Sequence, residues 1–109
     1  MLLLFLAACT GTPDVDTSAS VARCEDPTAV TWNNWAEDFF TTYCDACHSS
    51  RAVDRRGAPE SAVFDTEAQA VAQLARVRAR VLEQQTMPLG GGVFEDDLVL
   101  LGRWVDCLE

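Results

Sequence analysis

The chain has 109 residues, 49% of them hydrophobic, and 17 acidic against 8 basic residues give it a formal net charge of −9. This length accommodates a single domain, and the hydrophobic share excludes a disordered chain. The acidic balance excludes nucleic acid as a partner, because phosphates require a basic surface.

The chain begins with an apolar run, MLLLFLAA, that is too short to span a bilayer, which needs roughly 20 residues. It is similar to the apolar part of a secretory signal, and residues 6–9, LAAC, resemble a bacterial lipobox. We therefore expect residues 1–8 to be a lipoprotein signal peptide cleaved before Cys9, which would carry the lipid. The alternative is a buried N-terminal helix with an ordinary cysteine.

Residues 9–29 are mostly polar and predict a flexible tether, which leaves residues 30–109 for the folded domain. Anionic head groups repel an acidic domain. Attachment to a membrane would therefore come from the lipid on Cys9 alone.

The first predicted helix covers residues 31–44, with Thr31 as its N-cap. Apolar and aromatic residues recur there at helical spacing and form one face, made of Trp32, Trp35, Ala36, Phe39, Phe40 and Tyr43.

The motif Cys44-Asp45-Ala46-Cys47-His48 follows this helix and has the C-x-x-C-H pattern of c-type haem attachment. Two thiols at this spacing can add to the two vinyl groups of one haem, and the histidine after them can bind the iron. His48 is also the only histidine of the chain. The pattern predicts haem c held by Cys44 and Cys47, with His48 as the proximal ligand.

Three other uses of a C-x-x-C pair stay open. A thioredoxin-type redox pair expects a βαβ context, which the sequence does not suggest. A zinc site would need two more ligands, for which Cys24 and Cys107 are the candidates. The simplest alternative is a disulfide between Cys44 and Cys47.

The second predicted helix covers residues 66–85, with a capping box between Thr66 and Gln69. Its predicted apolar face consists of Val71, Leu74, Ala75, Val81 and Leu82. Met87 follows in a loop with Pro88 and three glycines. Because methionine often faces histidine across haem iron in electron carriers, we predict that Met87 is the distal ligand.

The third predicted helix covers residues 95–108, and three acidic residues in its first turn favour the positive end of the helix dipole. Its predicted apolar face consists of Leu98, Leu101, Trp104, Val105 and Leu108. With no strand pattern elsewhere, the sequence predicts an all-α fold of three helices around a covalently bound haem.

Residues 30–109 resemble a small class I cytochrome c domain of the bacterial lipoprotein type. In that family the helix before the haem motif crosses the C-terminal helix, and Ala36 and Phe40 match the crossing positions, with Leu101 and Trp104 opposite them. The resemblance implies that the carbonyl of Pro59 accepts a hydrogen bond from the proximal histidine, His48. The family's methionine-proline pair matches residues 87–88.

Two further sets of residues have predicted roles. Cys24 and Cys107 form an even pair in an exported protein, which predicts a disulfide. Haem propionates need cationic partners, for which Arg56 is our first candidate, before Arg55, Arg76 and Arg80.

These features predict a monohaem c-type cytochrome, which is a one-electron carrier rather than an enzyme. We expect it to be exported to the periplasmic side, lipid-anchored, monomeric and in transient contact with redox protein partners. The alternatives are a cofactor-free, disulfide-rich exported binding module and a thiol-disulfide redox protein that uses Cys44 and Cys47.

Overall fold

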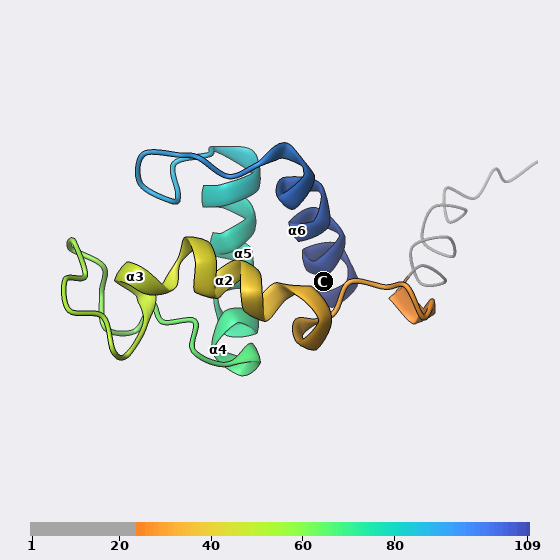
Figure 1. Cartoon of the computed structure of the whole chain (residues 1–109), viewed down its shortest axis with the longest axis horizontal. Helices are drawn as coiled ribbons and strands as arrows, with labels where there is room; N and C mark the ends of the chain where they lie inside the picture. Colours follow the sequence, from red (N-terminus) through yellow and green to blue (C-terminus); the bar gives the residue numbers. More distant parts are fainter. Residues whose placement is uncertain (1–23) are drawn as a thin grey trace, which may run out of the picture.

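The computed structural model describes residues 24–109, and within this range the chain forms helices and loops without a strand (Figure 1). The predicted all-α class is confirmed for this part of the chain. The predicted signal peptide, the lipidation site Cys9 and residues 9–23 of the predicted tether lie outside the described residues. Within the described residues, no helix has the length and apolar character needed to cross a membrane.

The first helical segment joins a π-helix, η1 (Trp32–Ala36), to an α-helix, α2 (Glu37–Tyr43). Thr31 is the N-cap, as predicted: its hydroxyl accepts from the backbone N–H of Asn34 at 3.1 Å, and the Asn34 side chain accepts from the Thr31 N–H at 2.8 Å. This reciprocal pair satisfies two backbone donors at the start of the segment. A short helix, α3 (Asp45–His48), follows directly.

The second segment consists of α4 (Glu67–Ala72), α5 (Leu74–Val77) and a π-helix, η2 (Arg78–Glu83), with an interruption at Gln73. The predicted capping box is confirmed, since Thr66 and Gln69 exchange side chain–backbone hydrogen bonds of 3.1 and 3.3 Å. The buried face differs from the prediction and consists of Ala70, Leu74, Val77 and Val81.

The prediction of a buried apolar face was therefore wrong for two of its residues. Val71 and Ala75 are exposed, because the small Ala70 is fully buried and the next position in the helix then points outwards. Hydropathy alone favoured the larger valine over its alanine neighbour.

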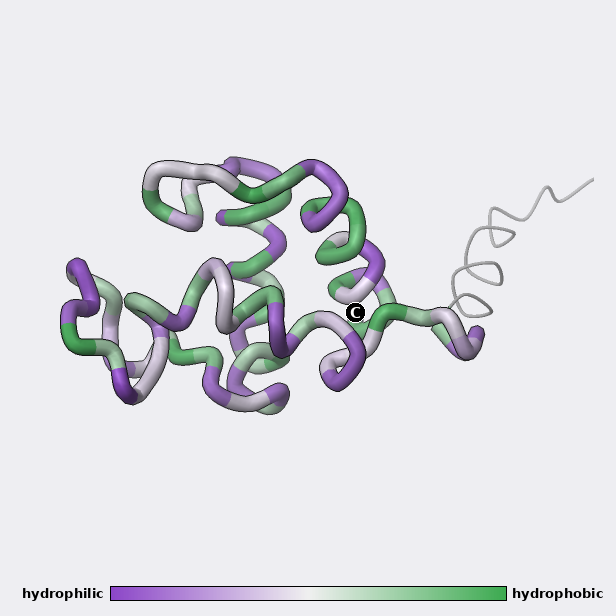
Figure 2. Tube along the Cα trace, in the orientation of Figure 1, coloured by the Kyte–Doolittle hydropathy of each residue, from purple (hydrophilic) through white to green (hydrophobic). Residues whose placement is uncertain are grey.

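The last helix, α6 (Glu95–Leu108), has the predicted bounds and contacts both η1 and η2. Its buried residues are Leu101, Trp104 and Val105, whereas Leu108, which we predicted to be apolar core, is 40% exposed at the helix end. Hydrophobic and hydrophilic residues alternate along the helices (Figure 2), as expected where each helix buries one side only.

Aromatic side chains fill the crossing of the first segment with α6. The ring of Trp104 meets Phe40 edge-on with centroids 5.5 Å apart and lies 6.2 Å from the ring of Trp32. Ala36 and Leu101 are fully buried at the same place. All five residues belong to one hydrophobic core.

Two links hold the ends of the described chain. A disulfide joins Cys24 to Cys107, the pairing expected from the sequence, and closes a loop over a sequence separation of 83. Arg78 pairs with Asp106 and Glu109 and so connects η2 to the end of α6. Residues 24–29, part of the predicted tether, contain a turn in which Asp26 accepts two hydrogen bonds from Thr28.

Candidate cofactor site

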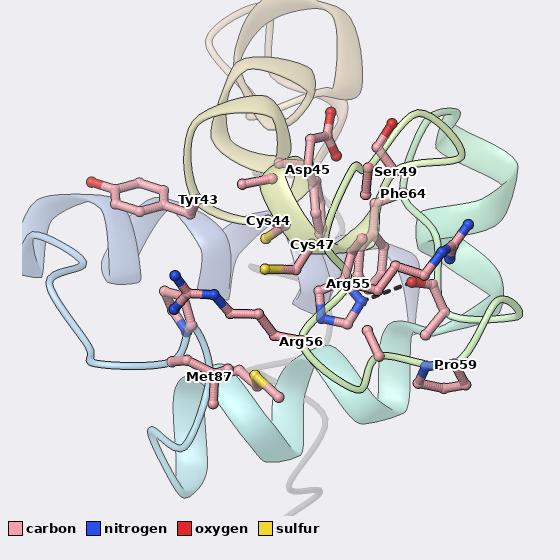
Figure 3. A pocket seen from close by; sticks show the side chains of 18 of the residues that line it. Tyr43, Cys44, Asp45, Cys47, Ser49, Arg55, Arg56, Pro59, Phe64 and Met87 are labelled. Carbon is pink, nitrogen blue, oxygen red and sulfur yellow. Dashed lines mark hydrogen bonds between the residues drawn. The ribbon is translucent and has the colours of Figure 1, made fainter.

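A cavity of about 980 Å³ lies between α3, η2 and the loops 49–66 and 84–94. This volume is at the upper end of the range for small-molecule and cofactor sites. The structure brings together all the residues that we predicted to bind the cofactor, since the cavity is lined by Cys44, Cys47, His48, Arg56, Pro59 and Met87 (Figure 3).

The C-x-x-C-H motif forms a single helical turn. Cys44 ends α2 with φ −120°, and its carbonyl accepts from the N–H of Cys47 at 3.2 Å and from the N–H of His48 at 2.9 Å. This turn holds all three side chains at the cavity, where Figure 3 shows those of Cys44 and Cys47. Both thiols are free of disulfides and half-buried.

A hydrogen bond fixes the orientation of the His48 ring. Its Nδ1 lies 2.7 Å from the carbonyl oxygen of Ala62. Because a carbonyl can only accept, Nδ1 carries the proton, which in the neutral ring leaves the lone pair on Nε2. The edge of Phe64 packs against the imidazole with ring centroids 5.4 Å apart. The histidine therefore has the tautomer of a metal ligand.

The acceptor for His48 is a correction to our expectation, which named the carbonyl of Pro59. That carbonyl accepts from the N–H of Ala62 at 3.0 Å and so closes the turn 59–62. The turn brings the carbonyl of Ala62, rather than that of Pro59, to the imidazole. Pro59 itself lines the cavity and is exposed.

Hydrogen bonds at its two ends close the loop that carries Ala62. The N–H of Phe64 donates to the His48 carbonyl at 2.8 Å, and the N–H of Ser50 donates to the Asp65 carboxylate at 3.1 Å. Hydrogen bonds from Ser50 and Ser49 hold the pKa of Asp65 below its ordinary value. The loop is thereby fixed against the motif that it supports.

Met87 reaches the cavity from the chain that follows η2. The carbonyl of Arg80 accepts from the N–H of Thr86 at 2.8 Å and from the N–H of Met87 at 3.1 Å, and Gln85 adopts a positive φ of 52° to make this turn. The side chain is half-buried, and Figure 3 shows it across the cavity from the two cysteines. Its role as a ligand stays a prediction, and the structure shows that Met87 lines the same cavity as His48.

Cationic side chains gather at this cavity although the chain is acidic overall. Its lining includes Arg51, Arg55, Arg56, Arg76 and Arg80. Nη1 of Arg55 is buried and has no hydrogen-bond partner within residues 24–109. Arg56, our first candidate for the propionates, is exposed. The unpartnered Nη1 makes Arg55 the better candidate for binding a carboxylate in this cavity, which the sequence alone did not reveal.

The environment of Cys44 bears on the alternative of thiol-disulfide chemistry. Burial, and to a lesser extent the negative charge of Asp45, raise the pKa of the Cys44 thiol to about 12. Disulfide exchange uses the thiolate, so a raised pKa disfavours attack by Cys44 at neutral pH. Burial and the charge of Asp65 likewise raise the pKa of Asp45.

The described residues do not provide the four ligands that the zinc alternative needs. Cys24 and Cys107, the further ligands that it needs, are joined in a disulfide. In the part of the chain that the structure describes, no three His, Cys, Asp or Glu side chains form a group that could hold a metal ion. His48 and Met87 fit an iron whose other ligands come from a porphyrin, because they contribute one donor each.

Comparisons of the chain with models of protein families, with curated proteins and with solved structures find no match. Inference about function therefore starts from the cavity and its lining.

Proposed function

We propose that the chain is a monohaem c-type cytochrome that carries single electrons between redox proteins, with residues 30–109 forming a small cytochrome c-like domain. The observation that carries this proposal is the cavity at which two free thiols, a histidine oriented through Nδ1 and a loop methionine meet. When bound, haem supplies an iron that accepts and releases one electron.

The residues of the motif would hold the cofactor covalently. Cys44 and Cys47 would each hold the haem through a thioether, formed by addition of the S–H group across one vinyl double bond. His48 offers Nε2 to the iron, and the Ala62 carbonyl increases the basicity of the ring by accepting from Nδ1. Met87 would offer its thioether sulfur to the iron as the second protein ligand.

The apolar and cationic residues of the cavity would contact different parts of the haem. Phe40, Phe64 and Val81 line it and would exclude water from a flat apolar ring. The buried Nη1 of Arg55 would donate to a propionate and thereby gain the partner that it lacks within the described residues.

The location of the protein is part of the proposal. The lipobox-like sequence at Cys9 indicates export and a lipid anchor on the periplasmic side of a membrane. A monomer in transient contact with redox partners fits this role.

Expression together with haem-attachment machinery tests the proposal. The purified chain should be red, show sharp absorption bands on reduction and gain the mass of one haem that survives denaturation. Cys44→Ser and Cys47→Ser should each lose one thioether, and His48→Ala should lose the proximal ligand. A colourless product without added mass would refute the proposal and favour the cofactor-free binding module.

The assignment of Met87 has its own test. Met87→Ala should lower the reduction potential and let carbon monoxide bind the reduced iron. Leu89→Ala is the matched control, because Leu89 lies in the same loop, lines the same cavity and is 56% exposed without a donor atom. If both variants keep the wild-type potential and exclude carbon monoxide, Met87 is not the ligand.

A further inference from the structure

A second, smaller groove of about 300 Å³ lies beside α2 and the start of α6. Four of the residues that line it are aromatic: Trp35, Phe39, Tyr43 and Phe94. The rings of Trp35 and Phe39 stack with centroids 5.0 Å apart, and those of Phe39 and Tyr43 are 4.9 Å apart. Phe94 is 74% exposed, so the groove is accessible from solvent.

The other lining residues give this groove negative charge. Asp38 and Asp97 carry carboxylates there, Thr42 is neutral, and none of the lining residues within 24–109 is cationic. Asp97 is held in place because its Oδ2 accepts from the Tyr43 hydroxyl at 2.7 Å. The first turn of α6 also contains Glu95 and Asp96, so the carboxylates outweigh the positive end of this helix.

Aromatic faces next to carboxylates are suited to an organic cation. A guanidinium or ammonium group over an aromatic ring is attracted by the negative face of that ring, and a nearby carboxylate adds an ion pair. A neutral apolar ligand would gain nothing from the carboxylates, and an anion would be repelled by them. The groove therefore selects for positive charge on an apolar stem.

We propose that this groove binds an arginine or lysine side chain of a partner protein. Its volume is at the lower end of the range for ligand sites, which fits one side chain better than a larger ligand. Arginine suits it especially, because its planar group stacks on aromatic rings and pairs with carboxylates. The net charge of −9 attracts a basic partner over a longer range.

The groove adjoins the cavity of the candidate site, because Tyr43 lines both. A partner whose cation occupies the groove would therefore lie within one side chain of the cavity wall. This consequence for electron transfer depends on the proposed function, whereas the binding of a cation does not.

The binding is tested with the purified full-length chain, in whatever cofactor state it is obtained, by NMR titration. The signal to follow is the indole N–H of Trp35. The probe is acetyl-arginine amide, and its control is acetyl-citrulline amide, which has nearly the same shape without the charge. We expect the arginine probe to cause saturable shifts and the citrulline probe to bind about threefold to thirtyfold more weakly.

Two pairs of variants localise the binding. Asp38→Asn should weaken it about twofold to fivefold, whereas Asp96→Asn, which removes the same charge outside the groove, should change it less than about twofold. Phe94→Ala should weaken it about twofold to fivefold, and Val99→Ala, at another exposed apolar residue of α6, should not. All four residues are exposed, so the helical circular dichroism should stay unchanged.

Three results would overturn the proposal. Equal binding of the citrulline probe would mean that charge is not recognised. Equal weakening by Asp38→Asn and Asp96→Asn would mean diffuse attraction to an acidic protein. Binding of tetramethylammonium without binding of the arginine probe would assign the groove to free quaternary ammonium compounds. A purified chain without haem would contradict the proposed function, but the binding of the arginine probe could still be measured.

Discussion

The aromatic crossing and the candidate cofactor cavity share Phe40 but are built differently. Where η1 and α2 cross α6, Phe40, Leu101, Trp104 and Val105 are all fully or almost fully buried against one another. Around the cavity, Cys44, His48 and Met87 are only half-buried, and loops supply much of the wall. The chain buries the first region with its own side chains, whereas it leaves the walls of the second half-buried.

The disulfide should give the largest effect, because it reinforces the packed side. Replacement of Cys24 and Cys107 by serine should lower the free energy of unfolding by about 4.5 kcal/mol, since the disulfide restricts a long loop in the unfolded chain. Urea denaturation with and without reductant measures this change. Intact mass after alkylation without reductant should reveal no reactive thiol at these two positions. Labelling of both would disprove the disulfide.

Truncation of the aromatic crossing should come next. Trp104→Ala should cost about 4 kcal/mol, because Trp104 is 2% exposed and packs against two other rings. The control at the cavity is Leu89→Ala, which should cost less than about 0.5 kcal/mol because Leu89 is already 56% exposed. Chemical denaturation of both variants checks the contrast, and equal costs would remove the distinction between the two regions.

The ion pairs of Arg78 should contribute less than either. Arg78→Ala removes contacts to Asp106 and Glu109 at the surface and should cost about 1 kcal/mol or less. The cost should shrink in high salt, because ions screen exposed pairs. Arg103→Ala removes the same charge at an exposed position of α6 and serves as the control. A cost that does not depend on salt would indicate lost packing instead of lost charge.

The smallest expected effect is a pH dependence at the cavity. The pKa of Asp45 is raised from 3.8, so the folded chain releases its proton at higher pH than the unfolded chain and loses stability as the pH rises from 3.8 through the raised pKa. Asp45→Asn should therefore match the wild type below pH 3.8 and exceed it at pH 7.

Asp65 should change the stability with pH in the opposite direction to Asp45. Its pKa is lowered from 3.8, so its contribution to stability is present above that value and is lost as the pH falls through the lowered pKa. Asp65→Asn should be less stable than the wild type at pH 7 and should approach it in acid. Thermal unfolding between pH 2 and 7 measures both curves. Parallel curves for Asp45→Asn and Asp65→Asn would contradict both assignments.

The helical part of the fold was predictable because its signals are local. The caps at Thr31 and Thr66 and the acidic start of α6 each act within one turn, and the structure has them where the sequence predicted them. The errors at Val71 and Ala75 arose from the packing of one segment on another, which hydropathy does not encode. At that crossing a small alanine is buried and a larger valine is exposed.

The lining residues of the candidate site were also predictable from the sequence, whereas their hydrogen-bond partners were not. The motif at Cys44, Cys47 and His48 and the loop methionine indicated one site, and the structure lines one cavity with them. The acceptor for His48 and the unpartnered arginine depend on the path of the loop 49–66 in space. Neighbouring positions there, such as Arg55 and Arg56, have the same chemistry but different burial.

The disulfide also decides how the domain would be presented on a support. The described chain starts at Cys24, which is joined to Cys107, and its first segment lies at the opposite end of Figure 1 from the loop 49–66. A peptide tag or an electrode linker attached upstream of Cys24 would therefore pivot about a covalent anchor on α6. Such immobilisation would leave the loop 49–66, which supplies part of the cavity lining, at the end of the domain away from the support.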